Sequence, residues 1–208
     1  FSDRFLNAGL SELTMACIMN GIVLHGGMYA ACGTFFVFSD YMKPAYRMAA
    51  LMRLPVKYVW SHDAFRVGED GPTHQPIEQE MQVRLLEKIK NHAGKNSMLV
   101  LRPADVYETT EAWKMAMENT DTPTALILSR QNVNDLPGDR VAESKKAAKG
   151  AYIVKACEGT PDIVMVANGS EVSTLFDGAK LLEERKNLKI QIVSAISEGL
   201  FRTQSKEY

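Results

Sequence analysis

The sequence predicts an α/β fold in which helices flank a mostly parallel sheet, followed by a smaller, partial second α/β domain. Short apolar runs rich in β-branched residues alternate with longer stretches of helical periodicity, which is the pattern of βαβ units. The 208 residues are 46% hydrophobic and 24% charged, as is ordinary for a globular chain. The alternation breaks once, between residues 132 and 150, and this break indicates a second domain.

The elements follow from local patterns. Residues 11–24 have helical periodicity, with Ser11 as the expected N-cap and Gly26 and Gly27 as the stop. Further helices are expected over residues 37–52, 77–91, 105–118 and 171–186. Strands are expected over residues 57–60, 98–101, 125–128, 163–166 and 190–193.

The break in the pattern contains Pro137, Gly138 and a lysine-rich run. We expect a first domain over residues 1–135, a linker over 136–150 and a second domain over 151–208. The last stretch holds only two or three expected strands and one helix, which is too little for an independent sheet. The chain also begins without methionine, so we expect both ends to be those of a piece of a longer protein.

The composition argues against several classes of partner. A formal net charge of −1 gives no basic surface for nucleic acid. No apolar stretch approaches the roughly 20 residues that span a bilayer, and no basic start precedes an apolar block. We therefore expect a cytoplasmic protein with no nucleic-acid and no membrane partner. Cys17, Cys32 and Cys157 are odd in number and widely spaced, which predicts reduced, buried thiols rather than disulfides or a zinc knuckle.

Residues 68–76 read Gly-Glu-Asp-Gly-Pro-Thr-His-Gln-Pro. Two glycines and two prolines in nine positions cannot continue a helix or a central strand, so the backbone must turn there with tightly defined dihedrals. The expected strand at 57–60 ends shortly before this loop. In open α/β sheets that edge is where ligands bind, so we interpret the loop as a shaped site that holds Glu69, Asp70 and His74.

These residues resemble the pyrimidine-binding domain of transketolase, a thiamine-diphosphate enzyme. The resemblance rests on the loop at 68–76, with His62 and Asp63 ahead of it. Other segments fall in the family's order: 48–52 (Met-Ala-Ala-Leu-Met), 101–105 (Leu-Arg-Pro-Ala-Asp), 128–132 (Leu-Ser-Arg-Gln-Asn) and 168–171 (Asn-Gly-Ser-Glu). It covers essentially the whole chain and implies the thiamine-diphosphate-binding fold. Residues 1–135 would be most of the pyrimidine-binding domain and 151–208 the beginning of the C-terminal domain, without the diphosphate-binding domain.

The resemblance assigns Glu12 to the cofactor. Its counterpart in the family hydrogen-bonds the aminopyrimidine of thiamine diphosphate, whose imino group then removes the thiazolium proton. An apolar setting that includes Leu10 and Leu13 would partly desolvate this carboxylate and favour its protonated form. On the residues alone, Glu12 is also explained as a first-turn glutamate after a Ser11 cap. The serine before it departs from the arginine that transketolases usually have there.

Phe35, Phe38 and Tyr41 recur at three-residue spacing. In the family the corresponding aromatic residues form the slot for the pyrimidine ring, and aromatic faces suit a flat heteroaromatic guest. Spacing alone also fits a buried helix face. The two interpretations predict different exposure of the three rings.

By resemblance, His62 and Arg130 bind the phosphate of a sugar-phosphate substrate, and a guanidinium fork at a strand end suits that group. Asp70 would hold a substrate hydroxyl, and His74 would assist proton movement. On the residues alone, Arg130 is also explained by a surface or interdomain salt bridge, and Asp70 and His74 by turn formation. A zinc site built from His62, Asp70 and His74 is a further alternative.

The resemblance implies transfer of a two-carbon ketol unit from a ketose phosphate to an aldose phosphate, in the pentose phosphate pathway. It implies a homodimer with thiamine diphosphate at the subunit interface. It also implies Mg²⁺ or Ca²⁺ whose ligands lie outside this chain, so no metal ligand is assigned here and the chain alone is expected to be inactive. The alternatives are a deoxyxylulose-phosphate synthase-like enzyme, and a non-catalytic subunit or dimerisation module of a split enzyme.

Two segments depart from the common pattern. Residues 64–67 (Ala-Phe-Arg-Val) place the Phe65 ring and the Arg66 cation where transketolases usually have small residues. The chain between Gln79 and Leu99 is also longer than the common form. We expect this extension, residues 88–96, to face solvent and to be peripheral to the chemistry.

Overall fold

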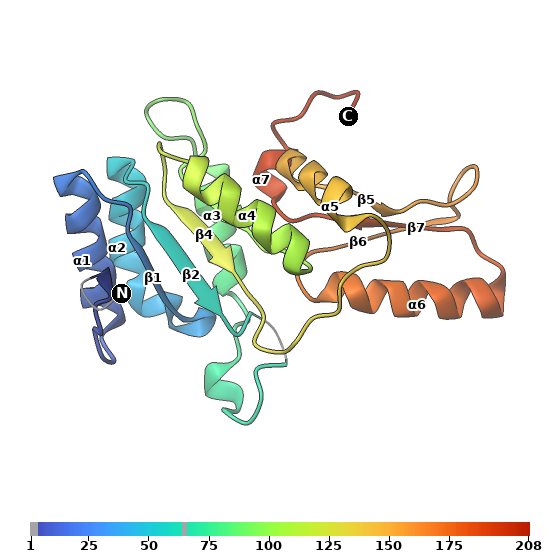
Figure 1. Cartoon of the computed structure of the whole chain (residues 1–208), viewed down its shortest axis with the longest axis horizontal. Helices are drawn as coiled ribbons and strands as arrows, with labels where there is room; N and C mark the ends of the chain where they lie inside the picture. Colours follow the sequence, from blue (N-terminus) through green and yellow to red (C-terminus); the bar gives the residue numbers. More distant parts are fainter. Residues whose placement is uncertain (1–3, 64–65) are drawn as a thin grey trace.

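The structure, a computed structural model, describes residues 4–63 and 66–208. Phe65, the bulky ring expected beside the candidate site, lies outside the described residues. A four-stranded sheet and a three-stranded sheet lie side by side along the long axis of the molecule (Figure 1). No helix in the described part of the chain is long and apolar enough to cross a membrane.

The first sheet is entirely parallel. Its strands are β1 (Ala31–Phe35), β2 (Lys57–Ser61), β4 (Thr124–Ile127) and β3 (Leu99–Leu101), in that spatial order. The sequence predicts β2, β3 and β4 but not β1, which has only one β-branched residue. A Cβ on Gly33 of β1 would lie 2.8 Å from the Val59 carbonyl oxygen, so close approach of β2 excludes a larger side chain there.

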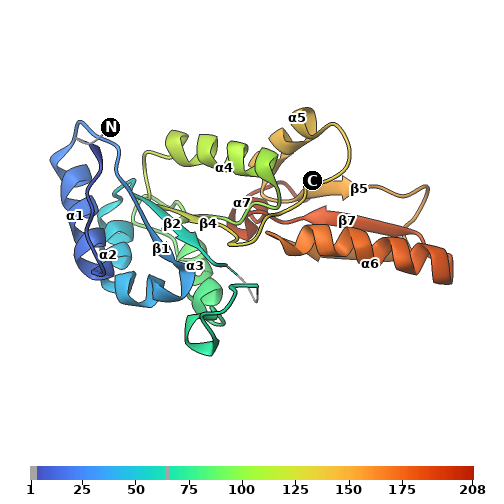
Figure 2. The same cartoon turned by 60° about the horizontal axis from the view of Figure 1, so that its bottom comes forward.

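Helices cover both faces of this sheet, as Figure 2 shows. One face packs against α1 (Glu12–His25), α2 (Ser39–Met52) and α3 (Gln79–Lys88) in one apolar core. The other packs against α4 (Val106–Glu118), and this second core continues into the next domain. The expected helix at 37–52 is observed as α2 preceded by a short 3-10 turn, η2 (Phe36–Phe38), and α3 is shorter than expected.

A buried polar chain fixes α1 against its neighbours. The Asn20 side-chain amide donates to the Ala45 carbonyl at 2.9 Å, and its oxygen accepts from the Tyr58 hydroxyl at 2.7 Å. Both polar ends of Asn20 are thereby used in a low-dielectric interior, where leaving them unpaired would cost about 1–3 kcal/mol. These bonds join α1 to α2 and β2.

The second sheet is mixed. Its order is β5 (Tyr152–Lys155), β7 (Ile190–Ser194), β6 (Ile163–Ala167), with β6 parallel and β5 antiparallel to β7. Helix α6 (Glu171–Lys186) has the bounds that the sequence predicts and packs on β6 and β7, and the short α7 (Glu198–Phe201) follows β7. The α/β class with a mostly parallel sheet is confirmed, and β5 is the third strand that the sequence did not locate.

The segment expected to be a linker is packed. It contains α5 (Arg140–Glu143) and the 3-10 helix η4 (Ser144–Lys149). Leu136 and Ala147 belong to the second core, and Arg140 and Ser144 are buried as well. This segment is therefore part of the core that the two domains share, and is not a flexible linker.

Two local expectations are corrected. Ser11 precedes α1 but makes no capping bond, because its hydroxyl donates to the Ala8 carbonyl at 2.5 Å, whereas Gly26 ends α1 with φ +90° as expected. All three cysteines are free, but only Cys32 is buried, since Cys17 is exposed and Cys157 is half-buried. The prediction of buried thiols is therefore right for Cys32 alone.

Candidate active site

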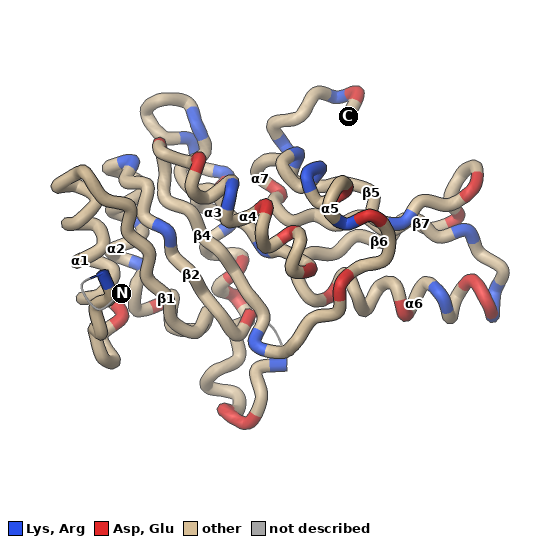
Figure 3. Tube along the Cα trace, viewed as in Figure 1, with Lys and Arg blue, Asp and Glu red and all other residues tan. Residues whose placement is uncertain are grey.

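The carboxyl ends of the parallel strands bring three of the sequence-predicted residues to one edge of the first sheet. Phe35 is the last residue of β1 and pairs in register with Ser61, the last residue of β2. His62 follows directly, and Arg130 lies three residues after Ile127, where β4 ends. The loop between β2 and α3 extends beyond the same edge, with the acidic tip visible in Figure 3. This is the crevice position expected for ligands of open α/β sheets.

The three predicted aromatic residues form a nearly parallel series. The ring centroids of Phe35 and Phe38 are 6.1 Å apart at an interplanar angle of 17°, and those of Phe38 and Tyr41 are 5.9 Å apart at 22°. Tyr41 is 62% exposed, which argues against a buried helix face. The buried aromatic of this segment is Phe36, whose ring stacks on Trp60 at 5.6 Å.

His62 lies against this series in an uncommon conformation. Its φ of +60° is left-handed, which costs a residue with a Cβ about 1 kcal/mol. The imidazole stacks on the Phe35 ring with 3.5 Å between centroids and an interplanar angle of 18°, and its Nδ1 lies 2.9 Å from the Ser61 hydroxyl. The stack and this contact hold the ring where the strand ends.

His74 approaches the same rings from the loop. It ends the 3-10 turn η3 (Pro72–His74), which begins after Gly71 at φ +80°. The imidazole meets Phe38 edge-on at 5.2 Å and Phe35 at 6.2 Å, and its Nδ1 lies 2.9 Å from the Thr73 hydroxyl. The turn chemistry of this loop therefore directs His74 toward the aromatic series.

Charged side chains surround His62. Burial lowers the pKa of His62, the Asp70 carboxylate opposes this shift, and the Arg130 guanidinium reinforces it. Arg130 lies over the loop backbone, since a Cβ on Gly68 would be 2.9 Å from its Cζ, and Gly68 has φ +94°. Within the described residues Arg130 makes no ion pair, so the salt-bridge alternative finds no partner there. The exposed Arg130 guanidinium, beside an imidazole whose pKa is lowered, can bind an anion.

Two family profiles match the chain. The one described as "Transketolase, pyrimidine binding domain" matches residues 1–135, and "Transketolase-like TK C-terminal domain" matches residues 150–208. The chain belongs to the transketolase family. The resemblance predicted from the sequence is thereby confirmed.

Relatives of known name agree with this assignment. The chain is 44% identical over 210 residues to a transketolase of Halalkalibacterium halodurans and 46% identical over 212 residues to one of Bacillus subtilis. Each alignment covers 100% of this chain and 30% of the relative. Among solved structures, transketolase from Leishmania mexicana superposes with a TM-score of 0.84 at 39% identity, covering 96% of this chain and 28% of that one. Transketolase from Campylobacter jejuni gives 0.81 at 38% identity, covering 98% and 30%. The chain therefore spans about 30% of the length of its curated transketolase relatives.

Glu12, the residue that the transketolase resemblance assigns to the cofactor, begins α1. Its side chain is half-buried, but Leu10 is 100% exposed and Leu13 is 44% exposed. Within the described residues, these two leucines therefore do not enclose the Glu12 carboxylate as expected. Across residues 4–63 and 66–208, the Glu12 side chain has no hydrogen-bond or ion-pair partner.

The zinc alternative lacks a ligand group. Among the described residues, no three His, Cys, Asp or Glu side chains gather as a metal site requires. His62 and His74 contact the aromatic series, and Asp70 acts on His62 electrostatically, but the three do not form such a group.

The sequence assigned Arg102 no role and Glu171 only that of a first-turn acid of a helix, although both lie in segments that carry the transketolase resemblance. Each follows a strand, and the structure joins them in a buried ion cluster between the two domains. Their positions after strand ends were the available signal. Their partners could not be read from the sequence, because the contact depends on how the domains pack.

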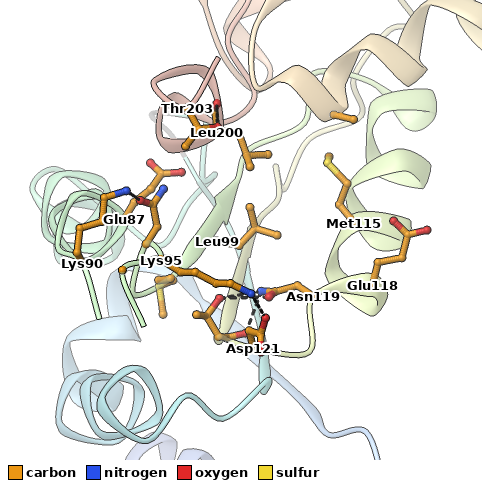
Figure 4. A pocket seen from close by; sticks show the side chains of 15 residues that line it. Glu87, Lys90, Lys95, Leu99, Met115, Glu118, Asn119, Asp121, Leu200 and Thr203 are labelled. Carbon is orange, nitrogen blue, oxygen red and sulfur yellow. Dashed lines mark hydrogen bonds and ion pairs between the residues drawn. The ribbon is translucent and has the colours of Figure 1, made fainter. Parts of the chain in front are cut away.

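A pocket of about 540 Å³ lies at the opposite, amino edge of the sheet (Figure 4). It contains none of the predicted site residues, and its lining includes Lys90, Lys95, Leu99, Met115, Asp121 and Leu200. Leu99 and Met115 face the hollow, while Lys95 pairs with Asp121 at its rim. Lys95 and Asp121 are the lining charges that pair with each other, and the pocket lies away from every residue that the sequence assigns to the site.

Proposed function

We propose that the whole protein containing this chain transfers a two-carbon ketol unit from a ketose phosphate to an aldose phosphate, as a thiamine-diphosphate enzyme of the cytoplasmic pentose phosphate pathway. The observation that carries this proposal is the aromatic series Phe35, Phe38 and Tyr41 at the carboxyl edge of the sheet, flanked by His62 and His74. Family membership supplies the cofactor, and this geometry supports a binding surface for its pyrimidine ring.

The residues present fit that cofactor. Nearly parallel, partly exposed aromatic faces suit a flat heteroaromatic ring, and Glu12 carries a carboxylate that is free within the described chain. When bound, thiamine diphosphate supplies the nucleophilic carbon that takes up and releases the two-carbon unit. Glu12 would share a proton with the pyrimidine ring, and Phe35, Phe38 and Tyr41 would orient that ring.

The remaining side chains are proposed to act on the substrate. Arg130 and His62 bind its phosphate, the first as a permanent cation and the second as a donor held by the Phe35 stack. Asp70, on the same side of the sheet, accepts a hydrogen bond from a sugar hydroxyl. His74, edge-on to the aromatic series, holds or moves a proton at the reacting carbon.

We further propose a homodimer with the cofactor between subunits. Beside the first turn of α1, Leu10 is wholly exposed, and along α1 and the segment after it Leu24, Met28 and Tyr29 are 64%, 61% and 64% exposed. Apolar surface of this extent along one helix and its flanking segments is expected to pack against another chain. A second subunit would also supply the apolar surroundings of Glu12 that this chain lacks. Mg²⁺ or Ca²⁺ would be held by residues outside this chain.

A non-catalytic subunit is one alternative, beside the synthase-like enzyme. The chain shares its fold with a protein described as "Split gene transketolase, inactive beta4 tetramer", at a TM-score of 0.73 and 24% identity, covering 95% of this chain and 58% of that one. Likeness at this identity bears on the fold alone. Activity of the whole protein decides between the two.

The test is ketol transfer from xylulose 5-phosphate to ribose 5-phosphate by the whole protein, with and without thiamine diphosphate and Mg²⁺. We expect transfer only with the cofactor. Phe38→Leu should raise the cofactor concentration needed for half-maximal activity about 10-fold, because stacking contributes roughly 0.5–1.5 kcal/mol beyond the area buried. Phe201→Leu, which removes a ring from the second domain, should not change it. A dimeric, cofactor-loaded protein without transfer would favour the non-catalytic subunit or the synthase-like enzyme.

A further inference from the structure

Arg102 follows β3 and is buried at the junction of the two domains, with its side chain 6% exposed. Its Nε donates to Asp63 Oδ2 at 2.9 Å, and Nη2 donates to both carboxylate oxygens of Glu171 at 2.9 and 2.8 Å. Nη1 donates to the Asn168 side-chain oxygen and lies 3.5 Å from Glu80 Oε2. One guanidinium therefore joins acceptors from three separate segments, at Asp63, Glu80 and residues 168–171, an arrangement that suits the planar fork of arginine.

The backbone reinforces this junction. The Arg102 N–H donates to the Ile196 carbonyl at 3.0 Å, and the Arg102 carbonyl accepts from the Gly169 N–H at 3.0 Å. A Cβ on Gly169 would lie 2.8 Å from Arg102 Nε, and its φ is +59°. Glycine at this position lets the second domain approach the guanidinium closely.

Asp63 connects the cluster to the candidate active site. It directly follows His62, the left-handed residue whose ring stacks on Phe35. The Ser129 side chain lies close enough to favour the charged form of the Asp63 carboxylate, and Ser129 directly precedes Arg130. The Asp63 carboxylate thus lies between the two segments that carry the proposed phosphate-binding side chains.

We propose that Arg102 is a positioning residue for the phosphate site. Its guanidinium binds Asp63 of the first domain and Glu171 of the second domain at the same time. The position of the second domain thereby sets the backbone conformation of His62, which precedes Asp63. The inference rests on the proposed function of His62. It assigns a task to a residue that touches neither cofactor nor substrate.

The electrostatics explain why the arginine is needed. Burial raises the pKa of Asp63, and the Arg102 guanidinium opposes that shift. A buried carboxylate that loses its cation must take up a proton or move toward water. Either change releases the backbone at the strand end, and the adjacent His62 has the strained conformation that would relax first.

Arg140 offers a matched control within the same chain. Its side chain is 3% exposed, Nε donates to Asp105 Oδ2 at 2.7 Å, and Nη2 donates to the Tyr152 hydroxyl at 2.9 Å and lies 3.7 Å from Glu108 Oε1. This cluster also joins the two domains, but none of these partners adjoins a predicted site residue. Loss of either arginine removes an interdomain ion cluster. Arg102 binds Asp63, the residue that directly follows His62, whereas Arg140 binds Asp105 and Tyr152.

The experiment compares Arg102→Met, Arg102→Lys and Arg140→Met in the whole, cofactor-loaded protein. We expect both methionine variants to lower the thermal unfolding midpoint. Only Arg102→Met should raise KM for the ketose phosphate, by about 10-fold or more with a smaller change in kcat, because small displacements of binding groups have effects of this size. Arg102→Lys, which keeps the charge but not the fork, should recover part of the loss. If Arg102→Met does not fold, Asp63→Asn should produce the same rise in KM.

Crystal structures of the native protein and the variants provide a readout that does not depend on turnover. We expect the 3.5 Å stack of His62 on Phe35 to be lost in Arg102→Met and kept in Arg140→Met. An intact stack and unchanged KM in Arg102→Met, or equal effects in both methionine variants, would overturn the inference. A native protein that transfers no ketol unit would refute the proposed function alone, because the stack still tests the role of Arg102.

Discussion

The two edges of the first sheet differ in how completely their charges are paired. At the amino edge Asp121 pairs with both Arg53 and Lys95, and the buried Lys57 ammonium donates to the Asn119 carbonyl at 2.7 Å. At the carboxyl edge Glu12, Asp70 and Arg130 have no ion-pair partner among the described residues, and His62 keeps a left-handed backbone. The charges named at the amino edge therefore have partners within the described part of the chain, whereas those named at the carboxyl edge do not, although the buried cluster of Arg102 and Asp63 at that edge is paired.

This difference is informative because folding alone favours paired charges. Charges and strain that remain at one edge do not contribute to the stability of this chain, so they are retained for another partner. The strongest test of this interpretation is to make the same chemical change at each edge and compare activity with stability.

The largest difference is expected for glutamate-to-glutamine variants. Glu12→Gln removes the proposed proton-sharing carboxylate, and kcat of the whole protein should fall about 10²- to 10⁴-fold, as for loss of a general acid or base. Glu118→Gln makes the same change beside the amino-edge pocket and should leave kcat within about twofold of the native value. Steady-state transfer kinetics at saturating cofactor measure both. Similar kcat values for the two variants would contradict the role of Glu12.

Arginine variants should show the next largest difference. Arg130→Met should raise KM for the phosphorylated acceptor about 10- to 100-fold, because a hydrogen bond to a charged group contributes about 1.5–3 kcal/mol. Arg53→Met breaks the amino-edge pair with Asp121 and should leave KM unchanged. The comparison is made with ribose 5-phosphate and its unphosphorylated analogue. If Arg130→Met raises KM by the same factor for the phosphorylated and the unphosphorylated acceptor, Arg130 does not bind the phosphate.

The sequence revealed the carboxyl edge better than the amino edge, for a physical reason. Turn residues around Gly71 and the strand end at His62 are local features, so their position at one edge was predictable. Strand β1 was missed because it contains Gly33, which lowers the expected strand propensity. This glycine is needed for close approach to β2, and that contact exists only once the two strands pair. The partners of Arg102 were missed for the same reason, since they come from three segments that meet only after the domains pack.

The third prediction concerns Lys57 at the amino edge, where a substitution is expected to increase stability rather than to reduce activity. Burial lowers the pKa of Lys57 to about 8 from its ordinary value of 10.5, so the folded protein binds fewer protons than the unfolded chain between those pH values. Stability from this group therefore rises as pH increases from about 8 to 10.5, and below pH 8 the buried ammonium is a constant cost. Lys57→Met should raise the free energy of unfolding at pH 7 by about 1–2 kcal/mol, after allowing for the lost bond to Asn119.

Urea unfolding of the whole protein at pH 7 and pH 10 measures this prediction. The advantage of Lys57→Met should shrink at the higher pH, where native Lys57 is largely neutral, and kcat should not change. A variant that is less stable than the native protein at pH 7 would show that the bond to Asn119 outweighs the cost of burial.

The smallest effect is expected from shortening the extension at residues 88–96. This loop lies at the amino edge of the sheet, and most of its hydrogen bonds are within the loop itself. Its side-chain contacts with the rest of the chain include the Lys95 pair with Asp121 and a 3.4 Å bond from Asn96 to the Gly199 carbonyl. Exposed pairs of this kind contribute little to stability. Removing the loop should therefore leave kcat and KM within about twofold and lower the thermal midpoint slightly. Loss of turnover in a folded, dimeric variant would mean that the amino edge takes part in the function of the carboxyl edge, through coupling across the sheet.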